Sequence, residues 1–214
     1  MAWNWLKKEY NKIVGNRQVQ NEVLGINPNN NSIFCSTINS KEVQDKVKEW
    51  NEIDKKNKLE FNKKEEEKYQ EAKKNKTTYN KKNYKPISRC DEYSTLVLKT
   101  AGLLPDNWPD PETTKVNEYW SVLSSKLKDN PEKGWNVMLM RSIDSKGKII
   151  GYAPHMAVIF VNDDNSISLA HYTGGKEMKS DDWSQKGIEN DGSDSRGGFR
   201  YSSFSYYPIK EKKK

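Results

Sequence analysis

Three side chains in this 214-residue sequence have the types that nucleophilic and acid–base chemistry requires: Cys90, His155 and His171. A thiolate is a strong nucleophile, and a neutral imidazole accepts a proton near pH 7. The two histidines are the only ones in the sequence. Cys35 is the second thiol, but no helix start follows it directly and no partner for it is implied. We therefore expect Cys90 to be the nucleophile.

Cys90 is predicted to lie in the first turn of a helix. Ser88 and Asp91 have the spacing of a capping box, which places Cys90 at the second helical position, and Gly102 is a stop signal. Between them an apolar face recurs at helical spacing: Tyr93, Leu96, Val97, Thr100 and Ala101. The helix dipole favours a thiolate there, and free backbone N–H groups can hold an oxyanion. On this feature alone, a buried structural cysteine is an equal alternative.

The two histidines are predicted to lie side by side on one face of a β-hairpin. Pairing Ile159 with Ile167 places His155 opposite His171 and leaves a loop of three residues, 162–164. All the paired apolar residues then share a face with both imidazoles, which a slip of one residue would separate. Such a pair is either a base held by a second group or half of a metal site. No third ligand follows at metal spacing, so we expect no metal.

The elements that position these residues are predicted to begin near residue 79. With 33% hydrophobic and 31% charged residues, the chain has apolar material for a core in one region only. We expect a charged helical extension over residues 1–78, a catalytic domain over 79–209 and a basic tail over 210–214. The extension has a narrow apolar stripe at helical spacing, formed by Val43, Val47 and Trp50, which predicts a helix. Beyond Lys55 the stripe thins, so we expect the helix to be solvated there.

Charge and hydropathy exclude two classes of partner. The formal net charge of +7 suits an anionic partner, but residues 41–85 carry ten acids among their lysines. Mixed charge of this kind indicates a solvated helix, so we expect no nucleic-acid binding. No apolar run approaches the length of a membrane span, and we expect no membrane insertion. The first residues do not form a secretory signal, so we expect synthesis in the cytoplasm without a signal peptide.

The order of these features resembles the NlpC-type papain-fold peptidoglycan peptidases. Residues 89–93 and 97–102 look like their nucleophile helix, although the usual Asp-Cys-Ser-Gly reads Arg-Cys-Asp-Glu here. Residues 133–141 resemble their Pro-Gly-Asp and apolar strand, with departures at Trp135 and Asn136. Residues 154–159 resemble their His-Val-Gly-Ile-Tyr strand, and His171 falls where they carry a third polar residue. The divergent motif and the absence of a signal are similar to the amidase effectors of type VI secretion.

The resemblance implies an α+β papain-like fold, with the nucleophile helix packed on a central antiparallel sheet. It implies that Cys90 attacks an amide of a peptidoglycan stem peptide or cross-link, that His155 transfers the proton and that His171 orients His155. Asp91 and either Tyr79 or Tyr84 are its substrate or oxyanion candidates. It requires no cofactor. It implies peptidoglycan as the substrate, action in the periplasm or cell wall after type VI or other signal-independent delivery, and an immunity protein or secretion component as a partner.

Three other interpretations fit parts of the sequence. A phage lysis enzyme would have the same chemistry, and an inactive or non-enzymatic papain-fold binding protein would share the fold. A lipid-acting enzyme of the permuted fold would carry its histidine before its cysteine, whereas Cys90 precedes His155 here.

Overall fold

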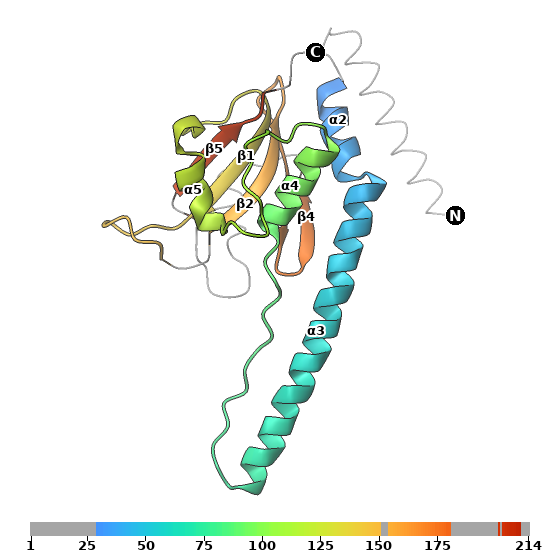
Figure 1. Cartoon of the computed structure of the whole chain (residues 1–214), viewed down its shortest axis with the longest axis vertical. Coiled ribbons are helices and arrows are strands. Elements are labelled where there is room, and N and C mark those ends of the chain that lie inside the picture. Colours follow the sequence, from blue (N-terminus) through green and yellow to red (C-terminus); the bar gives the residue numbers. More distant parts are fainter. Residues whose placement is uncertain (1–28, 151–153, 181–200, 202, 211–214) are drawn as a thin grey trace.

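The computed structural model describes residues 29–150, 154–180, 201 and 203–210, which form a five-stranded sheet, helices against one face of it, and a long arm (Figure 1). The helices are α2 (Asn29–Ile38), α3 (Lys41–Lys74), α4 (Cys90–Thr100) and α5 (Tyr119–Val122), with single 3-10 turns η1 (Val116–Glu118) and η2 (Ser124–Lys126). The strands are β1 (Gly134–Arg141), β2 (His155–Val161), β3 (Ile167–Thr173), β4 (Lys176–Ser180) and β5 (Ser203–Pro208). Their order is β4-β3-β2-β1-β5, and every neighbouring pair is antiparallel. The predicted α+β class and the N-terminal helix are confirmed, whereas predictions for residues 1–28 and 211–214 lie outside the described residues.

Alternation along the strands separates two apolar clusters on opposite faces of the sheet. On β2, Met156, Val158 and Phe160 pack in the cluster that contains α4. Ala157 and Ile159 pack in the other cluster, with side chains of β1, β3 and β5. Because successive side chains of a strand point to opposite faces, the parity of a residue on β2 decides which cluster it joins.

Helix α4 crosses the first of these faces against β2 and β3, and it ends as predicted. Gly102 adopts φ +70°, a left-handed conformation that glycine takes without steric cost. Its N–H donates to the carbonyl of Lys99 at 2.9 Å, and the N–H of Leu103 donates to the carbonyl of Leu98 at 2.8 Å. These two bonds satisfy carbonyls at the helix end, so the C-terminus of α4 is fixed by local sequence.

The register between β2 and β3 differs from the predicted one by two residues. Ile159 faces Leu169 rather than Ile167, and the connection has five residues, 162–166, rather than three. The longer loop is stable because the carboxylate of Asp164 accepts bonds from the N–H and hydroxyl of Ser166, at 2.9 and 2.6 Å. Asn165 takes the positive φ of 67° that closes it. A shift of two residues preserves the face of every side chain, so both histidines still share one face.

The predicted boundary near residue 79 does not separate two cores. The α4 side of the sheet is covered by one cluster of buried residues that includes both α2 and the first half of α3. The residues that these two helices contribute are Phe34, Ile38, Val43, Val47 and Trp50. Trp50 packs edge-on to Tyr172 of β3, with ring centroids 5.4 Å apart. Residues 29–54 therefore belong to the domain that carries Cys90.

This placement predicts a difference between the two halves of α3. Val47→Ala should lower the free energy of unfolding by about 2 kcal/mol, because it removes two buried methyl groups and leaves a cavity. Leu59→Ala should change it by less than about 0.5 kcal/mol, because Leu59 is 65% exposed. Urea unfolding followed by circular dichroism measures both. Equal effects of the two substitutions would show that α3 is not part of the core.

The second half of α3 and the returning chain form the arm, defined here as residues 55–88 (Figure 1). Two carboxylates of α3 hold the returning chain. Glu65 accepts the hydroxyl of Tyr79 and, at 2.9 Å, the N–H of Lys82. Asp54 accepts the hydroxyl of Tyr84 at 3.1 Å. The hydrogen bond from Tyr79 is the main reason that the pKa of Glu65 falls to about 2.

No helix in the described part of the chain combines the length and the apolar content that crossing a bilayer requires.

Candidate active site

Cys90 is the first residue of α4, and its side chain is fully buried. The predicted N-cap, Ser88, is wrong: Arg89 occupies that position without a side-chain capping bond. The hydroxyl of Ser88 lies 3.7 Å from the Cys90 sulfur instead, and Arg89 pairs with Glu92 at 2.9 Å. The helix therefore begins one residue later than predicted.

The surroundings of Cys90 keep its thiol protonated. Burial, and secondarily the neighbouring Asp91 carboxylate, raises the pKa of the thiol to about 11. Hydrogen bonds from Ser88 and from the backbone N–H groups of Met156 and Asp91 act in the opposite direction. These donors would stabilise a thiolate, but they do not offset the loss of solvation. In this conformation Cys90 is a neutral thiol in contact with the start of β2.

His155 and His171 form the histidine pair on one face of the sheet, as predicted, but the observed register places them diagonally rather than directly opposite each other. The Nε2 of His155 lies 2.7 Å from the Nδ1 of His171, and the rings meet edge-on with centroids 4.9 Å apart. Tyr201 stacks on the His155 ring at 6.3 Å and 13°. One proton lies between the two nitrogens, because a hydrogen bond needs one donor and one acceptor. If His155 donates it, the Nδ1 of His155 carries a basic lone pair.

Burial makes both imidazoles hard to protonate. It lowers the pKa of His155 well below the ordinary value of 6.5, and repulsion from His171 adds to the effect. It lowers the pKa of His171 to about 4. The pair is therefore neutral at pH 7.

The structure brings Cys90 and the histidine pair to the same strand end but onto different faces of the sheet. Met156, whose N–H points at the Cys90 sulfur, belongs to the cluster on the α4 face. His155 precedes it and points to the opposite face, where Tyr201 also packs. The polar neighbours of the sulfur described above do not include an imidazole. The expected contact between Cys90 and His155 is therefore not formed in this conformation.

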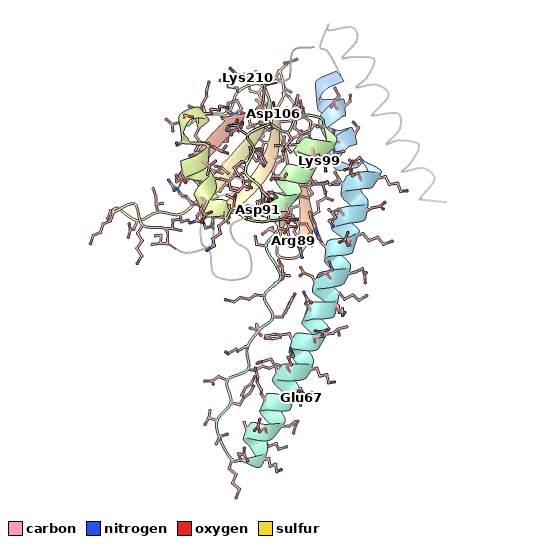
Figure 2. The ribbon with its side chains drawn as sticks, in the orientation of Figure 1. Glu67, Arg89, Asp91, Lys99, Asp106 and Lys210 are labelled. Atoms are coloured by element: carbon pink, nitrogen blue, oxygen red, sulfur yellow. The ribbon has the colours of Figure 1, made fainter. Side chains whose placement is uncertain are left out.

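The structure places the predicted accessory residues in two separate regions. Asp91 is next to the site: it is 8% exposed, burial raises its pKa, and its carboxylate accepts the N–H of Glu92 at 3.0 Å. Tyr79 and Tyr84 bond to α3 along the arm and do not reach Cys90. Figure 2 shows Arg89 and Asp91 where the arm meets the sheet. The assignment of a site tyrosine to residue 79 or 84 is corrected accordingly, because the carboxylates of α3 hold both hydroxyls.

Sequence reasoning missed three groups at the site. Ser88 was available as a neighbour of the thiol, since it stands two residues before Cys90, but its capping-box spacing suggested another role. The backbone N–H of Met156 has no sequence signal. Tyr201 is 46 positions beyond His155, and no local pattern predicts their contact.

Within the described residues, no group of three or more histidine, cysteine, aspartate or glutamate side chains is arranged to hold a metal ion. The two ring nitrogens of the histidine pair point at each other. A shared metal would need both nitrogens turned toward the ion instead.

The histidine pair predicts a loss of stability in mild acid. The pKa of His171 is lower in the folded chain, about 4, than the ordinary 6.5 of an unfolded chain. The unfolded chain therefore binds more protons between these values, so stability is complete above pH 6.5 and falls as the pH decreases toward 4. We expect a loss of up to about 2 kcal/mol between pH 7.5 and pH 5 from His171, and His155 adds in the same direction.

Urea unfolding at several pH values measures this loss. His171→Gln is the matched control, because an amide keeps a hydrogen-bonding partner for His155 but does not titrate. It should flatten the profile between pH 7.5 and pH 5. A profile as steep as that of the unchanged chain would exclude His171 as the cause.

No protein-family model, no curated protein and no solved structure matches this chain.

Proposed function

We propose that the chain is a cysteine hydrolase that cleaves an amide bond in the stem peptides or cross-links of peptidoglycan, with Cys90 as the nucleophile. One observation carries this proposal: Cys90 opens a helix that packs on an antiparallel sheet against β2, the strand that begins at His155. A thiol at this position lies in the positive end of the helix dipole and beside the strand that supplies a base.

The proposed reaction has two steps. The Cys90 sulfur attacks the amide carbonyl carbon, a C–S bond forms, the thiol proton passes to His155, and the C–N bond breaks as His155 returns that proton to the leaving amine. Water then hydrolyses the thioester and restores the thiol. The backbone N–H of Cys90 supports the oxyanion. His171 holds the Nε2 of His155, which directs the Nδ1 lone pair to the proton.

The proposal requires the His155 ring to move from its present face to the Cys90 sulfur. His155 is the first residue of β2, so the movement involves only the end of the strand, where His155 pairs with Met140 of β1. The hydrogen bond to His171 has to be kept through this movement, because the proposed role of His171 is to hold the Nε2 of His155. Until the ring moves, the buried thiol stays protonated and the enzyme is in a resting state.

A second candidate is a papain-fold binding protein without hydrolytic activity. The specific observation in its favour is the combination of a fully buried Cys90 with imidazoles on the opposite face. It shares the peptidoglycan partner but predicts no bond cleavage. A phage lysis enzyme would have the same chemistry as the proposed hydrolase.

The direct test is digestion of purified sacculi by the full chain, followed by mass analysis of soluble fragments. Released muropeptides would support the hydrolase, and their masses would identify the amide that is cut. Binding to sacculi without release would support the second candidate. Because this substrate lies outside the cytoplasm, we further propose that the chain acts in the periplasm or cell wall, with type VI secretion as one route of delivery and an immunity protein protecting the producer.

A further inference from the structure

The arm carries the whole net charge of the chain. Residues 55–88 contain twelve lysines and five acids, a net +7, and the complete chain has 37 basic and 30 acidic residues, also +7. The rest of the chain is neutral overall. The twelve lysines are Lys55, Lys56, Lys58, Lys63, Lys64, Lys68, Lys73, Lys74, Lys76, Lys81, Lys82 and Lys85. The first part of α3, residues 41–54, packs at the sheet and has five acids and three lysines, a net −2.

These lysines face solvent and are almost all unpaired. All twelve are exposed. Within the described part of the chain, Lys68 alone among them forms an ion pair, with Glu65 at 3.0 Å. A lysine ammonium that has no protein partner remains free to bind an external anion. The charge of the arm is therefore available for binding.

The arm presents this charge on a stiff rod. Its helical part, from Lys55 to the end of α3, spans about 30 Å. The returning chain is fixed to it by the bonds to Glu65 and Asp54 and by two ring contacts. These ring contacts join Phe61 with Tyr84 at 5.8 Å and Tyr69 with Tyr79 at 6.4 Å. Figure 2 shows long side chains projecting from both sides of the rod, and Glu67 far from the sheet.

We infer that the arm binds a linear, phosphate-bearing polymer of the cell wall. Lysine supplies point charges that attract phosphates without reading a planar group, and residues 55–88 contain no arginine for bidentate contacts. The four aromatic rings of the arm are used in the two ring pairs, so they are not arranged as a platform for stacked bases. A polyanion without bases fits these features better than a nucleic acid. The choice of a wall polymer rests on the proposed peptidoglycan substrate.

The test is binding of the full chain to poly(glycerol phosphate) by fluorescence anisotropy, across a salt series. The arm variant changes Lys63, Lys64 and Lys81 to Gln, and the matched control changes Lys99, Lys146 and Lys148 to Gln. All six lysines are exposed, and both variants lose three charges. We expect the arm variant to bind about tenfold more weakly at low salt and to show a shallower salt dependence, while the control binds like the unchanged chain.

Three results would overturn the inference. The arm and control variants could weaken binding equally, which would indicate net charge rather than the arm. The unchanged chain could fail to bind the polymer at low salt. It could also bind single-stranded DNA more tightly than poly(glycerol phosphate), which would identify a nucleic acid as the occupant. Binding needs no catalysis, so loss of hydrolysis with binding intact would contradict only the proposed function.

Discussion

Cys90→Ala should abolish the release of muropeptides from sacculi, with a loss of at least about 1000-fold. The substitution removes the atom that forms the covalent intermediate, and such losses are among the largest that single substitutions cause. Its fold should survive, because an alanine at the first position of α4 keeps the helix and replaces a small buried side chain. Thermal unfolding of the variant checks this point independently of activity.

Cys35→Ala is the matched control for this prediction. Cys35 is a half-buried thiol of α2 outside any disulfide, and it packs against the cluster that contains Cys90. Cys35→Ala should keep its hydrolytic activity within about twofold, since Cys35 has no role in the proposed reaction. If Cys90→Ala digests sacculi as fast as the unchanged chain, Cys90 is not the nucleophile. If the two substitutions have equal effects, a general loss of packing explains them.

His155→Ala should lower hydrolysis by about 100-fold to 10,000-fold, because general acid–base catalysis contributes factors of this size. His171→Ala should lower it less, because His171 acts only through its hydrogen bond to the Nε2 of His155. His171→Gln should recover part of that loss, since the amide can restore the bond. A ranking in which His171 matters more than His155 would contradict the proposed roles.

Alkylation of Cys90 by iodoacetamide reports whether His155 reaches the sulfur. In the conformation described here the pKa of the thiol is about 11, so the rate should rise about tenfold per pH unit between pH 7 and pH 10. If the His155 ring moves to the sulfur, an ion pair forms and a reactive thiolate appears near neutral pH. The alkylation rate should then level off near neutral pH, and this plateau should vanish in His155→Ala. A steep rise in both proteins, together with no digestion of sacculi, would support the binding protein instead.

The sequence was informative where structure is determined by local spacing. The apolar face of α4 and its end at Gly102 follow from residues within one helix, and both are present. The shared face of His155 and His171 depends only on the two-residue period of a strand, so it survived an error in the register. The start of α4 was misplaced because Ser88 can either cap a helix or bond to a thiol, and the spacing does not distinguish these roles.

The remaining errors concern contacts between distant segments. The change of composition near residue 79 suggested a domain boundary, but it reflects the solvated arm, which is inserted between two parts of one core. Tyr79 and Tyr84 looked like site residues because nothing local shows that Glu65 and Asp54 bind their hydroxyls. The face of the sheet that α4 covers is set by the packing of whole elements, so the order of Cys90 and His155 could not reveal it.

The five-residue loop between β2 and β3 has a consequence for how this protein can change over time. Insertions or deletions of two residues in the hairpin can leave both imidazoles on their common face, because they move strand pairing by a whole side-chain period. A change of one residue within a paired strand must be absorbed as a bulge or in the loop, or else it carries His171 to the face of Cys90. Length variation within the paired strands of relatives should therefore occur in even steps.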